Sequence, residues 1–288
     1  MHSPANNEAY KHCRDIARRH YENFPVASWL LPGELRDPIS AIYAFARTAD
    51  DLADEGDKSA SQRISELNAY SDSLDTMNRV NANPDPVFVA LNDSCTRFNL
   101  DKSLLEDLLT AFKQDVTTTR YANFPEVLAY CKYSANPVGR LLIQLVDKDT
   151  EQNRQYSDSI CTALQLINFY QDIQQDHVEN DRIYLAQDEM QHSGLTEQDI
   201  FNASDKENVV EFIHGQVLRA DKMLLSGLPL CGIIGGRLGF ELRFTVLGAH
   251  RVAEKLLDSR NVFARPRLTL FDWILSAFRV LSGKRFTD

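Results

Sequence analysis

The sequence lacks the patterns that build β-sheets. No run of β-branched residues alternates with polar ones, and the twelve glycines and ten prolines are few for 288 residues. Between the junctions where those residues gather, apolar side chains recur at three- and four-residue spacing, which is the period of an α-helix. The pattern therefore predicts an all-α fold, and we expect a single domain over residues 1–288.

Cysteine is also scarce. The five cysteines are widely spaced, their number is odd, and no pair forms a C-x-x-C motif, which argues against a disulfide framework. They are expected to be small buried residues in a reducing compartment. The seven histidines are scattered, so the sequence gives a zinc site little support.

Long apolar runs and a signal peptide are absent as well. No apolar run reaches the roughly 18 residues of a membrane-spanning helix, and the first eight residues lack the basic-then-apolar order of a secretory leader. We therefore expect a cytoplasmic protein. Basic residues are outnumbered, 31 against 41 acidic ones, and the net charge of −10 argues against nucleic-acid partners.

The C-terminal end differs in charge from the rest. From Arg243 to Asp288, nine basic and four acidic residues give a net charge of +5. Within this end, the helix expected at residues 268–281 is apolar on most of its circumference. The simpler interpretation is a packed terminal helix. The alternative is that residues 268–288 dock on an anionic membrane surface and make the protein membrane-associated.

The helix expected at residues 36–55 carries an unusual stripe. At about 100° per residue, one side presents a ring, a guanidinium and three carboxylates: Tyr43, Arg47, Asp50, Asp51 and Asp54. Carboxylates four residues apart repel each other, so a cation is expected to offset the repulsion, and Mg²⁺ suits carboxylate oxygens. The plain alternative is a solvated acidic face.

A second polar stripe lies on the helix expected at residues 157–176. Asn168, Asp172 and Asp176 follow at intervals of four, with Gln165 one turn earlier, on an otherwise apolar helix. The plain alternative is a partly exposed face. If the two stripes face each other, their carboxylates form a cage for Mg²⁺, which usually shares phosphate oxygens. The chemistry indicated is departure of a diphosphate, clamped by arginines, from a carbocation sheltered by aromatic rings.

The two stripes resemble the aspartate-rich motifs of the squalene/phytoene synthase family. The residues that carry the resemblance are Tyr43-Ala44-Phe45-Ala46-Arg47-x-x-Asp50-Asp51-x-x-Asp54 and Gln165-Leu-x-Asn168-x-x-x-Asp172-x-x-x-Asp176. The similarity extends from about residue 10 to Arg267. It implies a helical bundle of the isoprenoid-synthase type around a central apolar cavity, two or three Mg²⁺ ions, and a prenyl diphosphate substrate. It also implies adjacent enzymes of squalene synthesis as partners.

The resemblance assigns roles by position. The Mg²⁺ ligands would be Asp50, Asp54, Asp172 and Asp176. The diphosphate contacts would be His20, Arg47, Tyr184 and Arg265. The reacting end of the pocket would be lined by Phe24, Tyr43, Gln165 and Asn168, with Tyr43 and Asn168 catalytic. Plainer roles remain open: a core ring for Tyr43, a packing residue for Phe24, a surface histidine for His20, and a solvated or membrane-facing charge for Arg265.

Three departures separate this chain from the condensing members of the family. His20-Tyr21-Glu22-Asn23-Phe24-Pro25 replaces a serine-rich segment, Lys132 to Arg140 replaces a glycine-rich one, and Gln171 stands where arginine is usual. These features resemble the hydroxysqualene synthase branch of bacterial hopanoid biosynthesis. That branch ionises presqualene diphosphate, lets water capture the cation, and needs no NADPH.

Water capture requires a polar group near the cation. Lys132 and Asn136 are expected one turn apart at a kink made by Pro137, where Asn136 or a freed carbonyl would position the water and Lys132 would contact substrate. One alternative is a synthase that condenses two prenyl diphosphates into presqualene diphosphate, squalene, dehydrosqualene or phytoene. Another is a non-catalytic membrane-surface or assembly-factor domain, which the two intact aspartate motifs disfavour.

Overall fold

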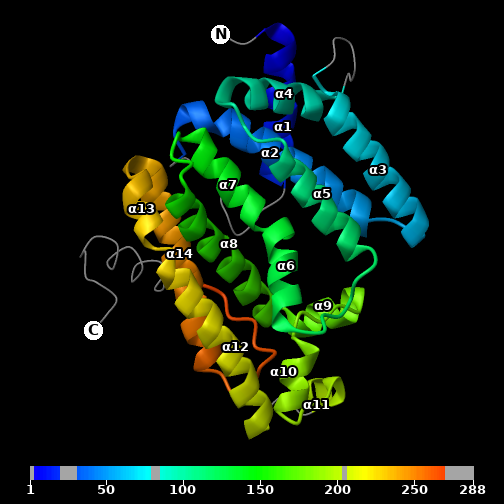
Figure 1. Ribbon diagram of the computed structural model, residues 1–288, viewed down its shortest axis with the longest axis vertical. Coiled ribbons are helices and arrows are strands. Elements are labelled where there is room, and N and C mark those ends of the chain that lie inside the picture. Colours follow the sequence, from blue (N-terminus) through cyan, green and yellow to red (C-terminus); the bar gives the residue numbers. More distant parts are fainter. Residues whose placement is uncertain (1–2, 20–30, 79–84, 203–205, 270–288) are drawn as a thin grey trace. The chain divides into compact units, whose positions relative to one another are not determined.

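The computed structural model describes residues 3–19, 31–78, 85–202 and 206–269. These residues form fourteen α-helices, and their one β-type pairing is an isolated bridge between Tyr121 and Ala186 (Figure 1). The all-α expectation is confirmed. In chain order the helices are α1 (Pro4–Arg19), α2 (Gly33–Asp54), α3 (Ala60–Thr76), α4 (Pro86–Phe98), α5 (Ser103–Asp115), α6 (Phe124–Ser134), α7 (Asn136–Leu145), α8 (Glu151–Gln171), α9 (Ile173–Asn180), α10 (Gln187–His192), α11 (Glu197–Asn202), α12 (Glu207–Ser226), α13 (Pro229–Ile234) and α14 (Gly236–Leu257).

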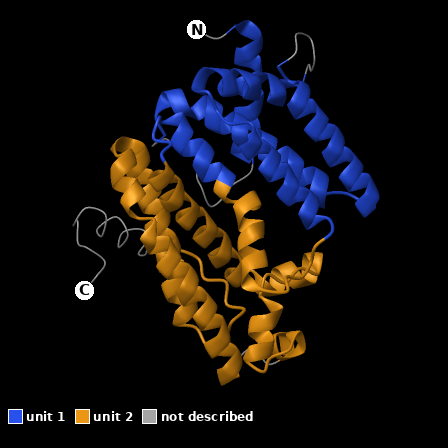
Figure 2. Cartoon of the chain, in the orientation of Figure 1, with its two compact units in different colours: residues 1–117, 137–150 blue, residues 118–136, 151–288 orange. Residues whose placement is uncertain are grey.

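The helices fall into two compact units (Figure 2). Unit 1 comprises residues 1–117 and 137–150, and unit 2 comprises residues 118–136 and 151–288. The first motif (Tyr43–Asp54) lies on α2 in unit 1, and the second motif (Gln165–Asp176) lies on α8 and α9 in unit 2. The expectation of one domain over the whole chain stays a prediction.

Unit 1 is built on the mutual packing of α1, α2 and α4. Its aromatic core is made by Phe45, Tyr70 and Phe88, with ring centroids 4.8 to 6.0 Å apart. These rings come from three helices, so their burial stabilises the platform from which α2 presents the first motif.

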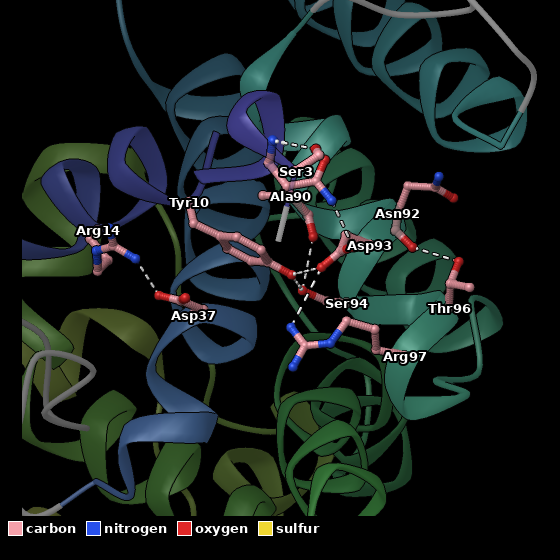
Figure 3. A network of polar contacts seen from close by, with 11 residues as sticks. Ser3, Tyr10, Arg14, Asp37, Ala90, Asn92, Asp93, Ser94, Thr96 and Arg97 are labelled. Atoms are coloured by element: carbon pink, nitrogen blue, oxygen red, sulfur yellow. Dashed lines mark hydrogen bonds and ion pairs between the residues drawn. The ribbon is translucent and has the colours of Figure 1, made fainter. Parts of the chain in front are cut away.

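A polar network ties α1 to α4 (Figure 3). The hydroxyl of the fully buried Tyr10 donates to Asp93 Oδ2 at 2.7 Å and lies 2.9 Å from Ser94 Oγ. Asn6 Nδ2 donates to the other oxygen of Asp93 at 2.7 Å. Burial raises the pKa of Tyr10, which keeps its hydroxyl protonated as the donor. Both carboxylate oxygens of Asp93 are therefore satisfied in a part-buried setting.

Unit 2 is organised by α8, which packs along α12, while α14 contacts both. A charged cluster fastens α10 to α12: Arg219 donates to both oxygens of Glu189, at 2.7 and 2.9 Å. The guanidinium carbon of Arg219 also lies 3.3 Å from the centroid of the Phe124 ring. This arginine thus joins three helices through a bidentate ion pair and a cation–π contact.

Helix ends follow local chemistry in most places. Ser59 caps α3 in a capping box with Gln62, and Asp101 accepts from the Ser103 N–H at 3.0 Å just ahead of α5, whose N-cap position is Lys102. The expected interruption before Pro137 is also present, because Ala135 leaves helical geometry with φ −120°.

Two expectations about helices were wrong. The polar sequence from Glu179 to Gly194 predicts a connection without helix, but it contains the end of α9 and all of α10, whose apolar anchor is the single buried residue Met190. The helix expected at residues 157–176 starts at Glu151 and is broken at Asp172. A six-residue polar helix carries too few apolar positions to reveal its period.

Candidate functional site

The first motif holds its own positive charge. Arg47 Nη1 donates to Asp50 Oδ2 at 3.0 Å, and its Nη2 lies 2.5 Å from Asp51 Oδ1 and 3.1 Å from Glu55 Oε1. Burial works against the charged guanidinium, but Asp50 and Asp51 outweigh it and raise the pKa of Arg47. Arg47 therefore offsets the repulsion between carboxylates along this stripe. The sequence analysis assigned that task to a metal ion.

Burial varies along the first motif. Tyr43, Arg47 and Asp50 are half-buried, whereas Asp54 is the last residue of α2 and is exposed. The predicted metal ligands Asp50 and Asp54 are thus presented at the solvent-facing end of the helix. Glu55, which the sequence interpretation did not include, contributes the third carboxylate around Arg47.

The second motif sits at a joint between two helices. Asp172 has φ −109° and ψ 14°, so α8 ends at Gln171 and α9 begins at Ile173. The one-turn spacing survives the break, because the Asp172 N–H donates to the Asn168 carbonyl and the Asp176 N–H to the Asp172 carbonyl, both at 2.9 Å. The four-residue spacing of the predicted stripe is therefore preserved in the backbone hydrogen bonds, although the helix is interrupted at Asp172.

Arg265 and Asp172 meet as a two-pronged ion pair. Arg265 Nε lies 2.5 Å from Asp172 Oδ1, and its Nη2 donates to Asp172 Oδ2 at 3.0 Å. The Asp172 side chain is 10 % exposed and that of Arg265 is 49 % exposed. The structure thus brings together a predicted metal ligand and a predicted diphosphate contact, and the arginine of the pair is half-exposed.

The carboxyl group of Asp176 is under-neutralised. Burial, followed by the neighbouring Asp172, raises its pKa to about 7, although Arg182 and Arg265 act in the opposite direction. Two adjacent carboxylates with excess negative charge are the donor set that suits Mg²⁺. Within the described part of each unit no three histidine, cysteine or acidic side chains converge on a metal position. The second motif therefore offers two carboxylates as possible metal ligands, and Mg²⁺ binding there stays a prediction.

Aromatic rings cluster beside the second motif within unit 2. Phe169 and Tyr184 stack with ring centroids 3.6 Å apart, and Tyr130 and Tyr121 continue the cluster. A small pocket is lined by both stacked rings together with Asp176 and Arg182. Tyr184 is buried in this stack, so the structure places its ring with the apolar wall. Arg182 is a site residue that the role assignments missed, although it precedes Ile183 and Tyr184 in a segment that resembles the family.

Asn136 and Lys132 have different environments. Asn136 is buried, and Thr162 Oγ1 donates to its Oδ1 at 2.9 Å. Lys132 is exposed, with its ammonium 5.8 Å from the centroid of the Tyr133 ring. The expected interruption lies between them at Ala135, so Lys132 belongs to α6 and Asn136 begins α7, and their predicted roles stay predictions. Gln165 and Asn168 are half-buried on α8.

Some predictions lie outside the described residues. His20, Phe24 and the rest of the departing segment His20 to Pro25 belong to this group, as does the C-terminal helix expected at residues 268–281 apart from its first two residues. In the part of the chain that the structure describes, none of the helices combines the length and apolar character needed to cross a membrane.

Comparison with known proteins gives consistent matches. The chain matches the family described as Squalene/phytoene synthase over residues 17–272. It is 40 % identical to a hydroxysqualene synthase of Zymomonas mobilis over 92 % of this chain and 89 % of that protein. Identity to the hydroxysqualene synthase of Rhodopseudomonas palustris is 32 %, over 91 % of this chain and 89 % of that protein.

A solved structure shares the fold. The crystal structure of squalene synthase HpnC from Alicyclobacillus acidocaldarius aligns with a TM-score of 0.82 at 31 % identity. The alignment covers 88 % of this chain and 95 % of that one.

Proposed function

The chain belongs to the squalene/phytoene synthase family, and on that basis we propose that it converts presqualene diphosphate and water into hydroxysqualene and diphosphate. The reaction needs Mg²⁺ and no NADPH. The carbon–oxygen bond to diphosphate breaks, and its electron pair leaves with the diphosphate. The cyclopropane ring of the resulting cation rearranges and opens as one of its carbon–carbon bonds breaks, and a water oxygen bonds to the cationic carbon and loses a proton, so no oxidant or reductant takes part.

Similarity to two hydroxysqualene synthases along nine-tenths of the chain supports this choice. The observation that carries it is Gln171. Its amide donates to the backbone carbonyl of Pro266 at 2.8 Å, at the position where condensing members usually carry an arginine. A second motif with one guanidinium fewer suits one diphosphate better than two.

The residues of each motif have separate tasks in this proposal. Asp50, Asp54, Asp172 and Asp176 would hold Mg²⁺, which when bound neutralises the leaving diphosphate. Arg265 would contact the diphosphate at the second motif, and Arg47 would contact it from the first motif, where it also binds Asp50, Asp51 and Glu55.

The apolar wall has the complementary task. The stacked rings of Phe169 and Tyr184 exclude bulk water and place π-faces near a cation. Tyr43 and Asn168 line the reacting end. Asn136, held by Thr162 in a buried position, orients the water that captures the cation.

Condensation of two prenyl diphosphates is the second candidate, and the name of the aligned solved structure, squalene synthase, favours retaining it. One experiment separates the two. The purified chain is incubated with Mg²⁺ and either presqualene diphosphate or farnesyl diphosphate, in water labelled with heavy oxygen, and the lipids are identified by mass spectrometry. In a parallel set of reactions, a chelator replaces Mg²⁺.

Each outcome has a defined meaning. An alcohol from presqualene diphosphate that carries the heavy oxygen on carbon supports the proposal, since attack at phosphorus would leave the alcohol unlabelled. A condensed product from farnesyl diphosphate supports the second candidate. No reaction with either substrate supports the non-catalytic domain, and equal activity with chelator overturns the Mg²⁺ requirement.

A further inference from the structure

Residues 259–267, here called the strap, follow α14 without forming a helix and carry Arg265 to the second motif (orange in Figure 1). The strap begins with a tight turn, in which Asn261 accepts from the N–H groups of Phe263 and Ala264 at 3.0 and 2.9 Å. His214 Nε2 lies 2.9 Å from the Ser259 carbonyl. The start of the strap is therefore fixed to α12.

Two side chains hold the other end of the strap through consecutive carbonyls. Gln171 Nε2 donates to the Pro266 carbonyl at 2.8 Å, and Lys255 Nζ donates to the Arg267 carbonyl at 3.0 Å. Proline at 266 also restricts Arg265 to extended backbone geometry. The direction in which Arg265 leaves the strap is thus set by backbone contacts on its C-terminal side.

An aromatic column holds the N-terminal side. Phe263 stacks on Phe201 with centroids 5.8 Å apart, and Phe201 stacks on His177 at 4.0 Å. His177 directly follows Asp176. Arg265 therefore sits between two anchors, both of which begin next to an aspartate of the second motif.

A half-exposed arginine ordinarily loses side-chain entropy when it is held in one geometry, which cancels much of the gain from an ion pair. Here the anchors immobilise its backbone before any ligand binds, so less freedom remains to be lost. The bidentate contact with Asp172 is the geometry that such positioning produces.

We propose that Gln171 is a positioning residue, which acts together with Lys255 to hold the strap so that Arg265 is presented to a diphosphate at the second motif. This inference rests on the proposed function only in that the site receives a diphosphate. Gln171 makes no contact with the ligand in this scheme. Its neutral amide sets the place of a guanidinium that comes from elsewhere in the chain.

The test measures binding of inorganic diphosphate by calorimetry, with and without Mg²⁺, to Gln171→Met, Arg265→Ala and the double variant. Methionine keeps the volume of glutamine without its donor. Gln175→Met is the matched control, because Gln175 donates to Glu179 on the exposed side of α9. Lys255→Met provides a second route to the strap if Gln171→Met does not fold.

Gln171→Met should weaken diphosphate binding about fivefold, the equivalent of one net hydrogen bond, and Lys255→Met should act in the same direction. Arg265→Ala should weaken it more, by about thirtyfold. The double variant should bind no more weakly than Arg265→Ala alone, since Gln171 acts through Arg265. A merely structural role would not give this non-additivity.

Wild-type affinity in Gln171→Met, or additive losses in the double variant, would overturn the proposal. Because the probe is inorganic diphosphate, the result does not depend on which lipid the enzyme makes. Failure of the lipid assay with intact coupling between Gln171 and Arg265 would therefore count against the proposed function alone.

Discussion

The rings of Phe169 and Tyr184 lie face to face, with centroids 3.6 Å apart and planes 4° from parallel. Phe169 comes from the last turn of α8 and Tyr184 from the segment after α9, so this pair closes the chain around the helix break at Asp172. The wall of the pocket and the geometry of the second motif consequently depend on the same contact.

Removal of the Tyr184 ring should therefore destabilise the protein. Tyr184→Ala is expected to lower the free energy of unfolding by about 3 kcal/mol, measured by urea titration. Tyr184→Phe should cost less than about 1 kcal/mol, since the ring stays. If Tyr184→Phe also leaves the KM for the diphosphate substrate unchanged, the predicted contact between the Tyr184 hydroxyl and diphosphate is wrong.

Arg47 neutralises carboxylates that Mg²⁺ would otherwise have to neutralise. Arg47→Met removes the cation that Asp50, Asp51 and Glu55 share, so the melting temperature of the variant should fall and should recover more on addition of Mg²⁺ than that of the wild type. Arg63→Met is the matched control, because the Arg63 guanidinium donates to the Ala53 and Gly56 carbonyls. An equal response to Mg²⁺ in Arg47→Met and wild type would contradict this account.

Asp176 carries a charge that its protein neighbours do not balance. Asp176→Asn should raise the melting temperature of the protein in chelator while it abolishes Mg²⁺-dependent release of diphosphate from the substrate. Glu179→Gln, on the exposed side of the same helix, should change neither quantity. A lower melting temperature of Asp176→Asn in chelator would show that the charge is compensated after all.

The Glu189–Arg219 pair should make stability depend on pH. Hydrogen bonds from Arg219, which outweigh the effect of burial, lower the pKa of Glu189 below its ordinary value of 4.5. A carboxyl group with a lowered folded-state pKa contributes stability that is present above about pH 4.5 and is lost as the pH falls through the folded value. Glu189→Gln should thus cost about 1 kcal/mol at pH 7, and the difference from wild type should shrink at acidic pH in urea titrations.

Four of the five cysteines should be inert in the native protein. Burial raises the pKa of Cys13, Cys131 and Cys231 to about 12 and that of Cys95 to about 11, so their thiolates are scarce at neutral pH. Cys161 is half-buried, and none of the five cysteines, all of which lie among the described residues, forms a disulfide. A thiol reagent should therefore label one residue per folded chain, and Cys161→Ser should remove that label. Labelling of Cys161→Ser without denaturant would contradict the burial of the other four.

The helices of unit 1 could be predicted because their apolar faces repeat with the helical period and some ends carry local signals, such as the capping residue Ser59. The break at Asp172 could not be predicted from the sequence. Asn168, Asp172 and Asp176 keep the four-residue spacing of an unbroken helix, and their backbone hydrogen bonds follow the same spacing. The short helix α10 also escaped prediction, because one buried methionine defines no period.

The candidate site also has a part that could be predicted from the sequence and a part that could not. The aspartate motifs and Arg265 were identified from residues and from family resemblance, and the ion pair of Arg265 with Asp172 brings two of them together. The role of Gln171 could not be read, because its partner is a backbone carbonyl, which any residue at position 266 would offer. A hydrogen bond to a backbone carbonyl does not depend on the side chain of the accepting residue, so the sequence does not reveal it.

The strap also sets the order of events during synthesis. Asp172 receives Arg265 from 93 residues further along the chain, so a growing polypeptide exposes the second motif long before its counter-charge exists. Until residues 265 and 266 have been synthesised, Asp172 lacks its ion-pair partner and Gln171 lacks the backbone carbonyl that it binds. Under the proposed function, diphosphate binding would therefore begin only after this C-terminal stretch has been added to the chain.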